Sequence, residues 1–313
     1  MRRVLRPGAV RDRLVEARLG RSDTYRPRAE LSWPLDEARL DEISIAWPER
    51  YFWPPTEAWL EPLRRGLAEF VRVERTDLPQ TDTPVVVIRV SMAGETHEVG
   101  IDYSDYTDID ETIAASVPLY FKMQHLATGY GERSVVPGGY VPNSPRLYDL
   151  LGGLRGVRSR PAVPRLFGRF SPNNDVRRQG IALLEGQQRF EFDGGLALQR
   201  YGAYLAEAAR SAACLDLPGR GPLCFRLIDL LAIGCCIVGP PHEAVLHVPL
   251  EPGVHLTATR ADLSNLVDAA AALLEDEDRR AAQQAAAADF FDRYLERRQL
   301  AAYYLHEILA RIA

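Results

Sequence analysis

The chain has 313 residues, of which 46% are apolar, and it carries a formal net charge of -5. This length and apolar content allow a large core and two domains of ordinary size. No basic run is long enough to follow nucleic-acid phosphates, no window reaches the roughly 18 apolar residues that span a bilayer, and the basic N-terminus lacks an apolar segment of the signal-peptide type. We therefore expect a soluble cytoplasmic protein with no nucleic-acid partner and no integral membrane segment.

The first half of the chain, residues 1–155, predicts an α/β unit preceded by an irregular arm. Residues 1 to about 40 are charged and weakly periodic. Thr56 can cap a helix whose apolar residues recur at helical spacing. A continuous apolar run, such as that at 85–90, is typical of a strand covered on both faces. The strands expected here are residues 42–46, 71–74, 85–90 and 98–103.

A glycine- and arginine-rich stretch, residues 152–164, has the composition of an interdomain linker and leads into a second unit, residues 156–313. Strands and helices alternate in this unit, which is typical of a parallel, Rossmann-like sheet. The four cysteines lack metal-ligand spacing and indicate small core residues. The expected strands are 165–170, 189–192, 212–216 and 235–238, and the expected helices lie near 174–185, 197–210, 224–233, 263–274 and 290–309.

The segment from Gly219 to Pro241 combines a loop, an amphipathic helix, a glycine stop and a buried strand. Arg226 and Asp229 are three residues apart near the start of the helix, so their side chains project from one face. The rest of this helix is apolar, and charges in such a setting are costly without a partner. An anionic, hydroxyl-rich ligand would supply one, and an intrahelical ion pair is the alternative.

The pattern Arg226-x-x-Asp229-x-x-Ala-x-Gly followed by an apolar strand resembles the donor-binding helix of retaining GT-B glycosyltransferases. The resemblance implies two Rossmann-like domains with parallel sheets flanked by helices, and a last helix that crosses back to the first domain. It implies that Asp229 accepts the ribose hydroxyls and that Arg226 contacts the diphosphate. Where the family usually carries a second acidic residue, eight positions before Asp229, this chain has Gly221.

Other loops of the second unit follow strands, where backbone N–H groups of loops and helix starts can bind anions. The resemblance places the diphosphate near the pair Gly168–Arg169, with Arg177 as a second cation. Glycines let the backbone approach a phosphate or a base closely, and ordinary turns are the alternative. The residues assigned to donor binding from these loops are Gly168, Arg169, Asn173, Arg177, Gly194, Gly195 and Gly219.

Carboxylates also cluster after the strand expected at 98–103. Asp105, with Asp102 behind it, is our candidate for the base that accepts the proton of an acceptor hydroxyl, and a solvated acidic loop is the alternative. Asp108-Ile109-Asp110 matches the metal-binding pattern of GT-A enzymes, but we assign no metal site. Lys122, the only lysine of the chain, is assigned as a donor contact, with a buried salt bridge as the alternative.

These observations predict a metal-independent glycosyltransferase that moves a sugar from a nucleotide-diphosphate sugar to a hydroxyl acceptor, without a further cofactor. Arginines and helix N-termini would neutralise the departing diphosphate. Two alternatives remain open, which are a catalytically silent GT-B-like binding or scaffolding protein and a nucleotide-sugar epimerase of the same fold. The presence of Gly221 favours the silent protein, and the presence of Arg169, Arg226 and Asp229 favours the enzyme.

Overall fold

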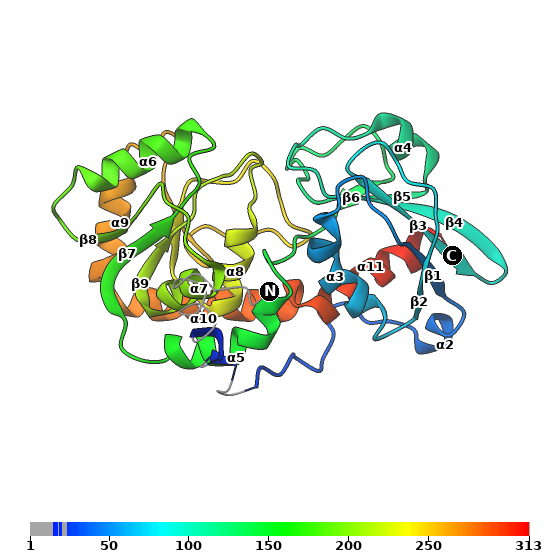
Figure 1. Ribbon diagram of the computed structural model, residues 1–313, viewed down its shortest axis with the longest axis horizontal. Coiled ribbons are helices and arrows are strands. Elements are labelled where there is room, and N and C mark those ends of the chain that lie inside the picture. Colours follow the sequence, from blue (N-terminus) through cyan, green and yellow to red (C-terminus); the bar gives the residue numbers. More distant parts are fainter. Residues whose placement is uncertain (1–14, 18, 21–23, 313) are drawn as a thin grey trace, which may run out of the picture.

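The computed structural model describes residues 15–17, 19–20 and 24–312, so the predicted arm lies partly outside the described residues. The chain forms two β-sheets that are flanked by helices and lie side by side (Figure 1). The predicted α/β class is therefore confirmed. We call the part that carries the first sheet the N-terminal half and the part that carries the second sheet the C-terminal half.

The first sheet has the strand order β2-β1-β3-β4-β5-β6. β3 pairs antiparallel with both β1 and β4, so the prediction of a wholly parallel sheet is wrong for this half. For β3 and β4 the cause is the two-residue turn Ala93–Gly94, whose φ angles of 51° and 86° suit a tight hairpin, whereas a parallel pair needs a long crossover. The strands are β1 (Ser44–Pro48), β2 (Arg72–Thr76), β3 (Val85–Met92), β4 (Glu95–Asp102), β5 (Leu119–Lys122) and β6 (Val135–Pro137).

The N-terminal half carries the helices α2 (Glu37–Leu40), α3 (Thr56–Leu67) and α4 (Glu111–Ser116). Leu60, Leu63 and Leu67 of α3 are fully buried, as their helical spacing predicts. Thr56 is the first residue of α3, and its side chain does not cap the helix, since Pro55 holds the capping position. The predicted cap at Thr56 is therefore wrong.

The second sheet is parallel throughout, with the order β11-β10-β9-β7-β8. The chain enters at β7, adds β8 on one side and continues with β9 on the other side. Ligands of open α/β sheets bind at such a reversal, beyond the carboxyl ends of the strands. The elements are β7 (Val163–Arg169), α6 (Asp175–Glu185), β8 (Glu191–Gly195), α7 (Tyr201–Arg210), β9 (Ser211–Leu215), α8 (Phe225–Ile233), β10 (Ile237–Gly239), β11 (Thr257–Ala258) and α9 (Leu266–Glu275).

The stretch with the composition of an interdomain linker, residues 152–164, is mostly helical. Helix α5 spans Arg146–Arg158, and only residues 159–162 separate it from β7. The side chain of Arg158 is buried and donates to the carbonyl oxygens of Ala209 and Ser211, so this end of α5 is fixed to the C-terminal half. The glycine and arginine content of the stretch does not by itself predict this packing.

The end of the chain runs through α10 (Glu277–Phe290) and the π-helical turn η1 (Phe291–Leu295) into α11 (Arg297–Arg311). Figure 1 shows α11 in red within the N-terminal half, where it contacts α3. The ring of Tyr304 stacks on Phe121 with centroids 3.8 Å apart, and its hydroxyl donates to the carbonyl oxygen of Gly138 at 2.8 Å. No helix among the described residues is long and apolar enough to cross a membrane.

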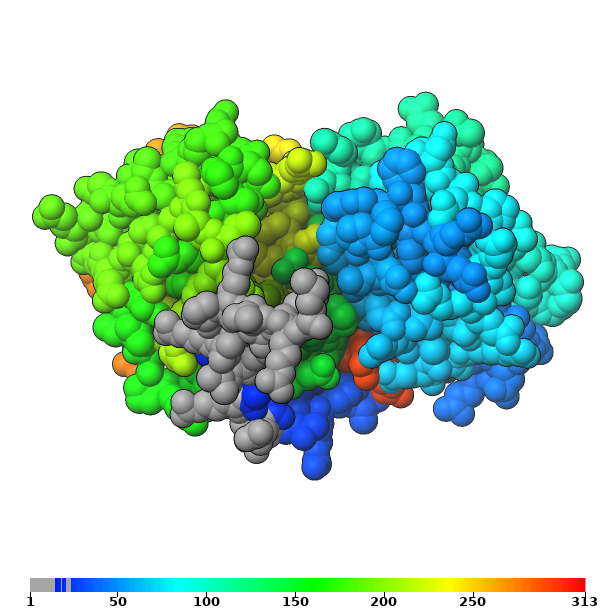
Figure 2. Space-filling model, viewed as in Figure 1, coloured from blue at the N-terminus to red at the C-terminus, as the bar shows by residue number. Residues whose placement is uncertain are grey.

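Buried polar contacts also join the two halves. The buried amide of Gln124 donates to the carbonyl oxygen of Leu223 at 2.8 Å and accepts from its N–H at 2.9 Å. The backbone N–H of Val245 donates to the carbonyl oxygen of His125 at 2.7 Å. Figure 2 shows that the surface is nevertheless hollowed between the green and the blue halves.

Candidate functional site

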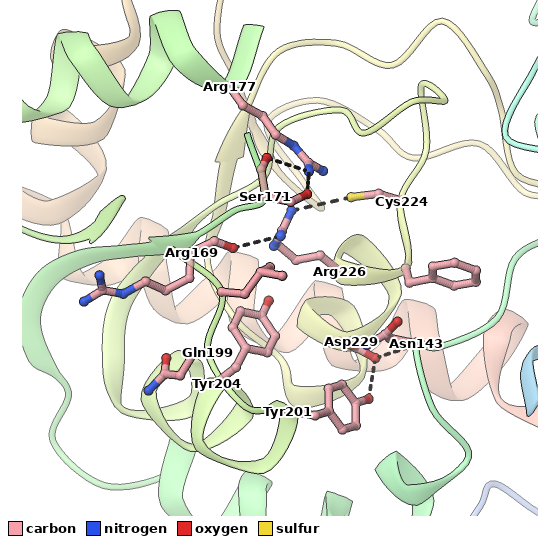
Figure 3. Close-up of a pocket in the computed structure, with 12 residues that line it drawn as sticks. Asn143, Arg169, Ser171, Arg177, Gln199, Tyr201, Tyr204, Cys224, Arg226 and Asp229 are labelled. Carbon is pink, nitrogen blue, oxygen red and sulfur yellow. Dashed lines mark hydrogen bonds between the residues drawn. The ribbon is translucent and has the colours of Figure 1, made fainter. Parts of the chain in front are cut away.

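A cavity of about 290 Å³ lies where the chain reverses direction between β7 and β9. Its walls come from the loop after β7 and from the starts of α6, α7 and α8, and Figure 3 shows their side chains converging. We call it the α8 cavity. It is lined by Asn143, Arg169, Ser171, Arg177, Leu198, Gln199, Tyr201, Tyr204, Cys224, Phe225, Arg226 and Asp229.

Helix α8 begins at this cavity for local reasons. Cys224 holds the N-capping position without a side-chain hydrogen bond to the helix, and Gly234 ends the helix in a left-handed conformation at φ 78°. The first two residues of the helix, Phe225 and Arg226, line the cavity. A helix N-terminus that no side chain caps presents free N–H groups and the positive end of the helix dipole.

Arg226 is held in the cavity wall by neutral groups. Its Cζ lies 4.0 Å from the centroid of the Phe170 ring, and its Nη2 donates to the carbonyl oxygen of Arg169 at 2.9 Å. Its Nε is buried and has no hydrogen-bond partner among the described residues. No carboxylate of the described chain forms an ion pair with Arg226, so the intrahelical pair with Asp229 that was the alternative does not occur.

Arg177, which is 4% exposed, is a second cation of this kind. Its guanidinium donates to the carbonyl oxygen of Pro218 at 2.8 Å, to Ser171 Oγ at 3.0 Å and to Asn173 Oδ1 at 2.9 Å. All of these acceptors are neutral. Burial lowers the pKa of Arg177, and the nearby charge of Arg226 lowers this pKa further. Two cations that repel one another in a cavity would be stabilised by an anionic ligand.

Arg169 lines the cavity but is already paired. Its guanidinium forms an ion pair with Asp193 and donates to the carbonyl oxygen of Gly194 at 2.7 Å. Asp193 also pairs with Arg165 at 2.8 Å. Arg169 therefore contributes less uncompensated charge to the α8 cavity than Arg177 and Arg226 do.

Asp229 lies in the cavity wall and is 1% exposed. Its Oδ1 accepts hydrogen bonds from the Tyr201 hydroxyl at 2.9 Å and from the Asn143 N–H at 3.2 Å, as Figure 3 shows. Burial raises the pKa of Asp229 to about 7. Because both of these hydrogen bonds go to Oδ1, Oδ2 is left as an acceptor for a ligand hydroxyl.

The N-terminal half contacts the loop before α8 at Gly221, and neither Gly221 nor Asp105 is among the residues that line the α8 cavity. A Cβ at this position would lie 2.3 Å from the carbonyl oxygen of Asp105 and 2.7 Å from Gln124 Nε2, so no larger residue fits without displacement. The side chain of Asp105 is half-buried and forms no hydrogen bond or ion pair with another described residue. Burial raises the pKa of Asp105, whereas the charges of Arg220 and Arg177 oppose this rise.

Asp102 and Lys122 do not reach the α8 cavity. Lys122 is fully buried, and its Nζ donates to Asp102 Oδ2 and to Ser104 Oγ, each at 2.8 Å. The Tyr120 hydroxyl also donates to Asp102 Oδ2, at 2.7 Å. The buried salt bridge that was the alternative for Lys122 is therefore present. This arrangement corrects the assignments of Lys122 as a donor contact and of Asp102 as a second base.

The remaining assigned residues surround the site without lining it. Gly168 and Gly194 pack against their own sheet, where a Cβ on Gly194 would lie 1.9 Å from the Phe192 ring. Gly195, with φ 132°, ends β8. Gly219 lies close to Arg177, and Asn173 accepts a hydrogen bond from Arg177. Asp110 of the Asp-x-Asp sequence caps α4 through the N–H of Ile113 at 3.0 Å.

Several residues in or beside the site were not predicted from the sequence. Tyr201 and Tyr204 face the cavity from the start of α7, and their spacing of three residues is the signal that could have identified them. Buried Asp216, just beyond β9, approaches His242 Nε2 at 3.1 Å and Cys224 Sγ at 3.4 Å. Burial alone would raise the pKa of Asp216, but His242 lowers it below its usual range. These residues fix the loop before α8.

A scan against models of protein families and a search of the curated proteins found no match to this chain.

Proposed function

We propose that the protein is a metal-independent glycosyltransferase that binds a nucleotide-diphosphate sugar in the α8 cavity. The observation that carries the proposal is that two guanidinium groups, those of Arg177 and Arg226, line one cavity without a carboxylate partner in the described chain. Beside them, α8 begins without a side-chain cap. Together these groups would form a positively charged binding site for a diphosphate.

Each part of the donor has a candidate contact in this proposal. The diphosphate contacts Arg226 and Arg177, with Arg169 assisting, and Asp229 Oδ2 accepts a ribose hydroxyl. As the sugar is transferred, charge accumulates on the leaving diphosphate, and fixed cations that face this charge lower the barrier. Asp105, across the interface at Gly221, is the proposed base because its half-buried carboxyl has no competing hydrogen bond.

The proposal includes a GT-B arrangement of two Rossmann-like domains. The parallel second sheet, the cavity at its reversal and the contact of α11 with α3 support it. The antiparallel β3–β4 hairpin departs from the simplest form of such a domain. A catalytically silent relative is the second candidate, and it is favoured by Gly221, where the N-terminal half leaves no room for the usual carboxylate.

The test is release of nucleoside diphosphate from a panel of nucleotide-diphosphate sugars, with and without mixed hydroxyl acceptors. We expect release that depends on the acceptor, and we expect Asp105→Asn to reduce it by about 10² to 10⁴, the usual contribution of a general base. Binding of a nucleotide sugar without any release would favour the silent relative. Isomerised sugar still attached to the nucleotide would instead indicate an epimerase.

A further inference from the structure

Three aromatic side chains form a continuous row between the surface of the N-terminal half and the α8 cavity. The ring centroids of Trp53 and Trp59 are 4.7 Å apart, and those of Trp59 and Phe225 are 4.9 Å apart. Trp53 is 48% exposed, whereas Phe225 lines the cavity. This aromatic row (Trp53, Trp59 and Phe225) therefore leads from solvent to the proposed donor site.

Exposed apolar side chains adjoin both ends of this row. Among the described residues, seven large apolar side chains are exposed, and Phe52, Trp53, Tyr106 and Leu198 are four of them. Phe52 adjoins Trp53 at the outer end of the row, and Leu198 lines the cavity itself. Tyr106 follows Asp105, the proposed base. Apolar surface that gathers at an opening in this way marks a binding site rather than scattered surface residues.

Two charged side chains close to Trp53 in the sequence are already paired. Arg50 forms an ion pair with Asp77 at 2.5 Å, and Glu57 pairs with Arg75 at 2.8 Å. The surface beside Trp53 therefore favours an uncharged ligand over an anion or a cation, in contrast to the cationic α8 cavity.

The orientations of the rings further restrict the kind of ligand that fits the row. The planes of Trp53 and Trp59 are inclined at 70°, and those of Trp59 and Phe225 at 39°. Rings that turn from one to the next form no flat slot for a fused aromatic ligand. Successive sugar units of a glycan present separate apolar C–H faces in changing orientations, and they also carry the hydroxyl groups that a glycosyl acceptor needs.

We propose that the aromatic row is the acceptor subsite and that it binds a neutral oligosaccharide whose end reaches Phe225. The assignment of this ligand as an acceptor rests on the proposed function, but its binding to the row does not. The ligand would contact Trp53 at its outer part and present a terminal hydroxyl near Asp105.

The test probes the full chain with an array of neutral, acidic and basic glycans and with aryl alcohols. The dissociation constants of the compounds that bind are then measured by calorimetry for the wild type and for Trp53→Ala. The control variant is Leu183→Ala, which shortens an exposed apolar residue of α6 that lies outside the row and the cavity. Uridine and guanosine diphosphates are titrated separately into all three proteins.

We expect neutral oligosaccharides to bind, and we expect Trp53→Ala to weaken them about tenfold while Leu183→Ala has no effect. The affinity for nucleoside diphosphates should not change in either variant. Absence of glycan binding, tighter binding of aryl alcohols or charged glycans, or equal affinity in wild type and Trp53→Ala would overturn the proposal. Glycan binding by the row without diphosphate binding would uphold the subsite and contradict only the transferase function.

Discussion

Replacement of Arg226 by methionine tests whether the guanidinium of Arg226 binds a ligand or stabilises the fold. Methionine retains much of the length and apolar volume of arginine but removes the guanidinium. In the free protein the variant loses a long hydrogen bond to Cys224 Sγ, and it also loses a hydrogen bond to a carbonyl oxygen and a contact with the Phe170 ring, which are worth about 1 to 2 kcal/mol each. It also removes the cost of burying a charge, a cost that the nearby carboxylates of Asp216 and Asp229 offset in part although neither forms an ion pair with Arg226.

Because these contributions have opposite signs, we expect the free energy of unfolding of Arg226→Met to stay within about 2 kcal/mol of the wild type. Binding of a nucleoside diphosphate should fall much more, by about 2 to 5 kcal/mol, since the variant loses a charge-assisted contact in a desolvated site. Urea unfolding gives the first quantity, and calorimetric titration of uridine and guanosine diphosphates gives the second.

Arg155→Met is the matched control. Arg155 also lies over an aromatic ring, that of Tyr25 at 5.1 Å, but its guanidinium forms two hydrogen bonds with Asp292, at 2.7 and 2.8 Å. Loss of this partly exposed pair should destabilise the protein by about 1 to 3 kcal/mol and leave diphosphate binding unchanged. If Arg226→Met were as destabilised as Arg155→Met and bound diphosphate normally, Arg226 would be a structural residue and our reasoning would be refuted.

Three further substitutions test other parts of the structure. Asp229 has a pKa raised to about 7 from an ordinary value of 3.8, so between these pH values the folded protein binds more protons than the unfolded chain, and stability falls as the pH rises through this range. Asp229→Asn should lack this component when urea unfolding is measured at several pH values, and an unchanged pH dependence would contradict the assignment. Gly221→Ala should lower the free energy of unfolding by about 1 to 3 kcal/mol, because its Cβ would overlap the Asp105 carbonyl oxygen. Gly156→Ala, in open space on α5, should raise it by about 0.5 to 1 kcal/mol. Equal melting temperatures of the two variants would show that the halves do not meet closely at Gly221. Lys122→Met should lower the free energy of unfolding by about 3 to 5 kcal/mol and leave the affinity for nucleoside diphosphates unchanged. A loss of affinity without a loss of stability would restore Lys122 to the donor site.

The sequence predicted best where periodicity and local chemistry agree. The apolar run at 85–90 lies within β3, and the helix predicted at 224–233 matches α8, because a continuous apolar core and a glycine stop determine each element locally. The hairpin between β3 and β4 was missed because its turn, Ala93–Gly94, lies between two predicted strands whose ends were placed too far apart. Composition did not reveal that the stretch 152–164 is largely helical, because the packing of α5 depends on contacts with residues about fifty positions further along the chain.

The candidate site was likewise predicted only where local sequence patterns determine it. Arg226 and Asp229 were identified because both charges occur in one apolar helix, and they line one cavity. Asp102 was placed in the site because it ends a predicted strand, and Lys122 because a lysine in an apolar strand needs a counter-charge. The two instead pair with one another in the core of the N-terminal half. A single sequence does not show which charges pair across strands, nor does it show that the Asp105 carbonyl occupies the space beside Gly221.

The most direct test of the central claim is a crystal structure of the protein with a nucleoside diphosphate. We predict that the two phosphate groups lie within hydrogen-bond distance of Arg177 and Arg226 at the start of α8, and that a ribose hydroxyl donates to Asp229 Oδ2. A diphosphate bound elsewhere, or an α8 cavity that stays without nucleotide at saturating concentration, would contradict the account.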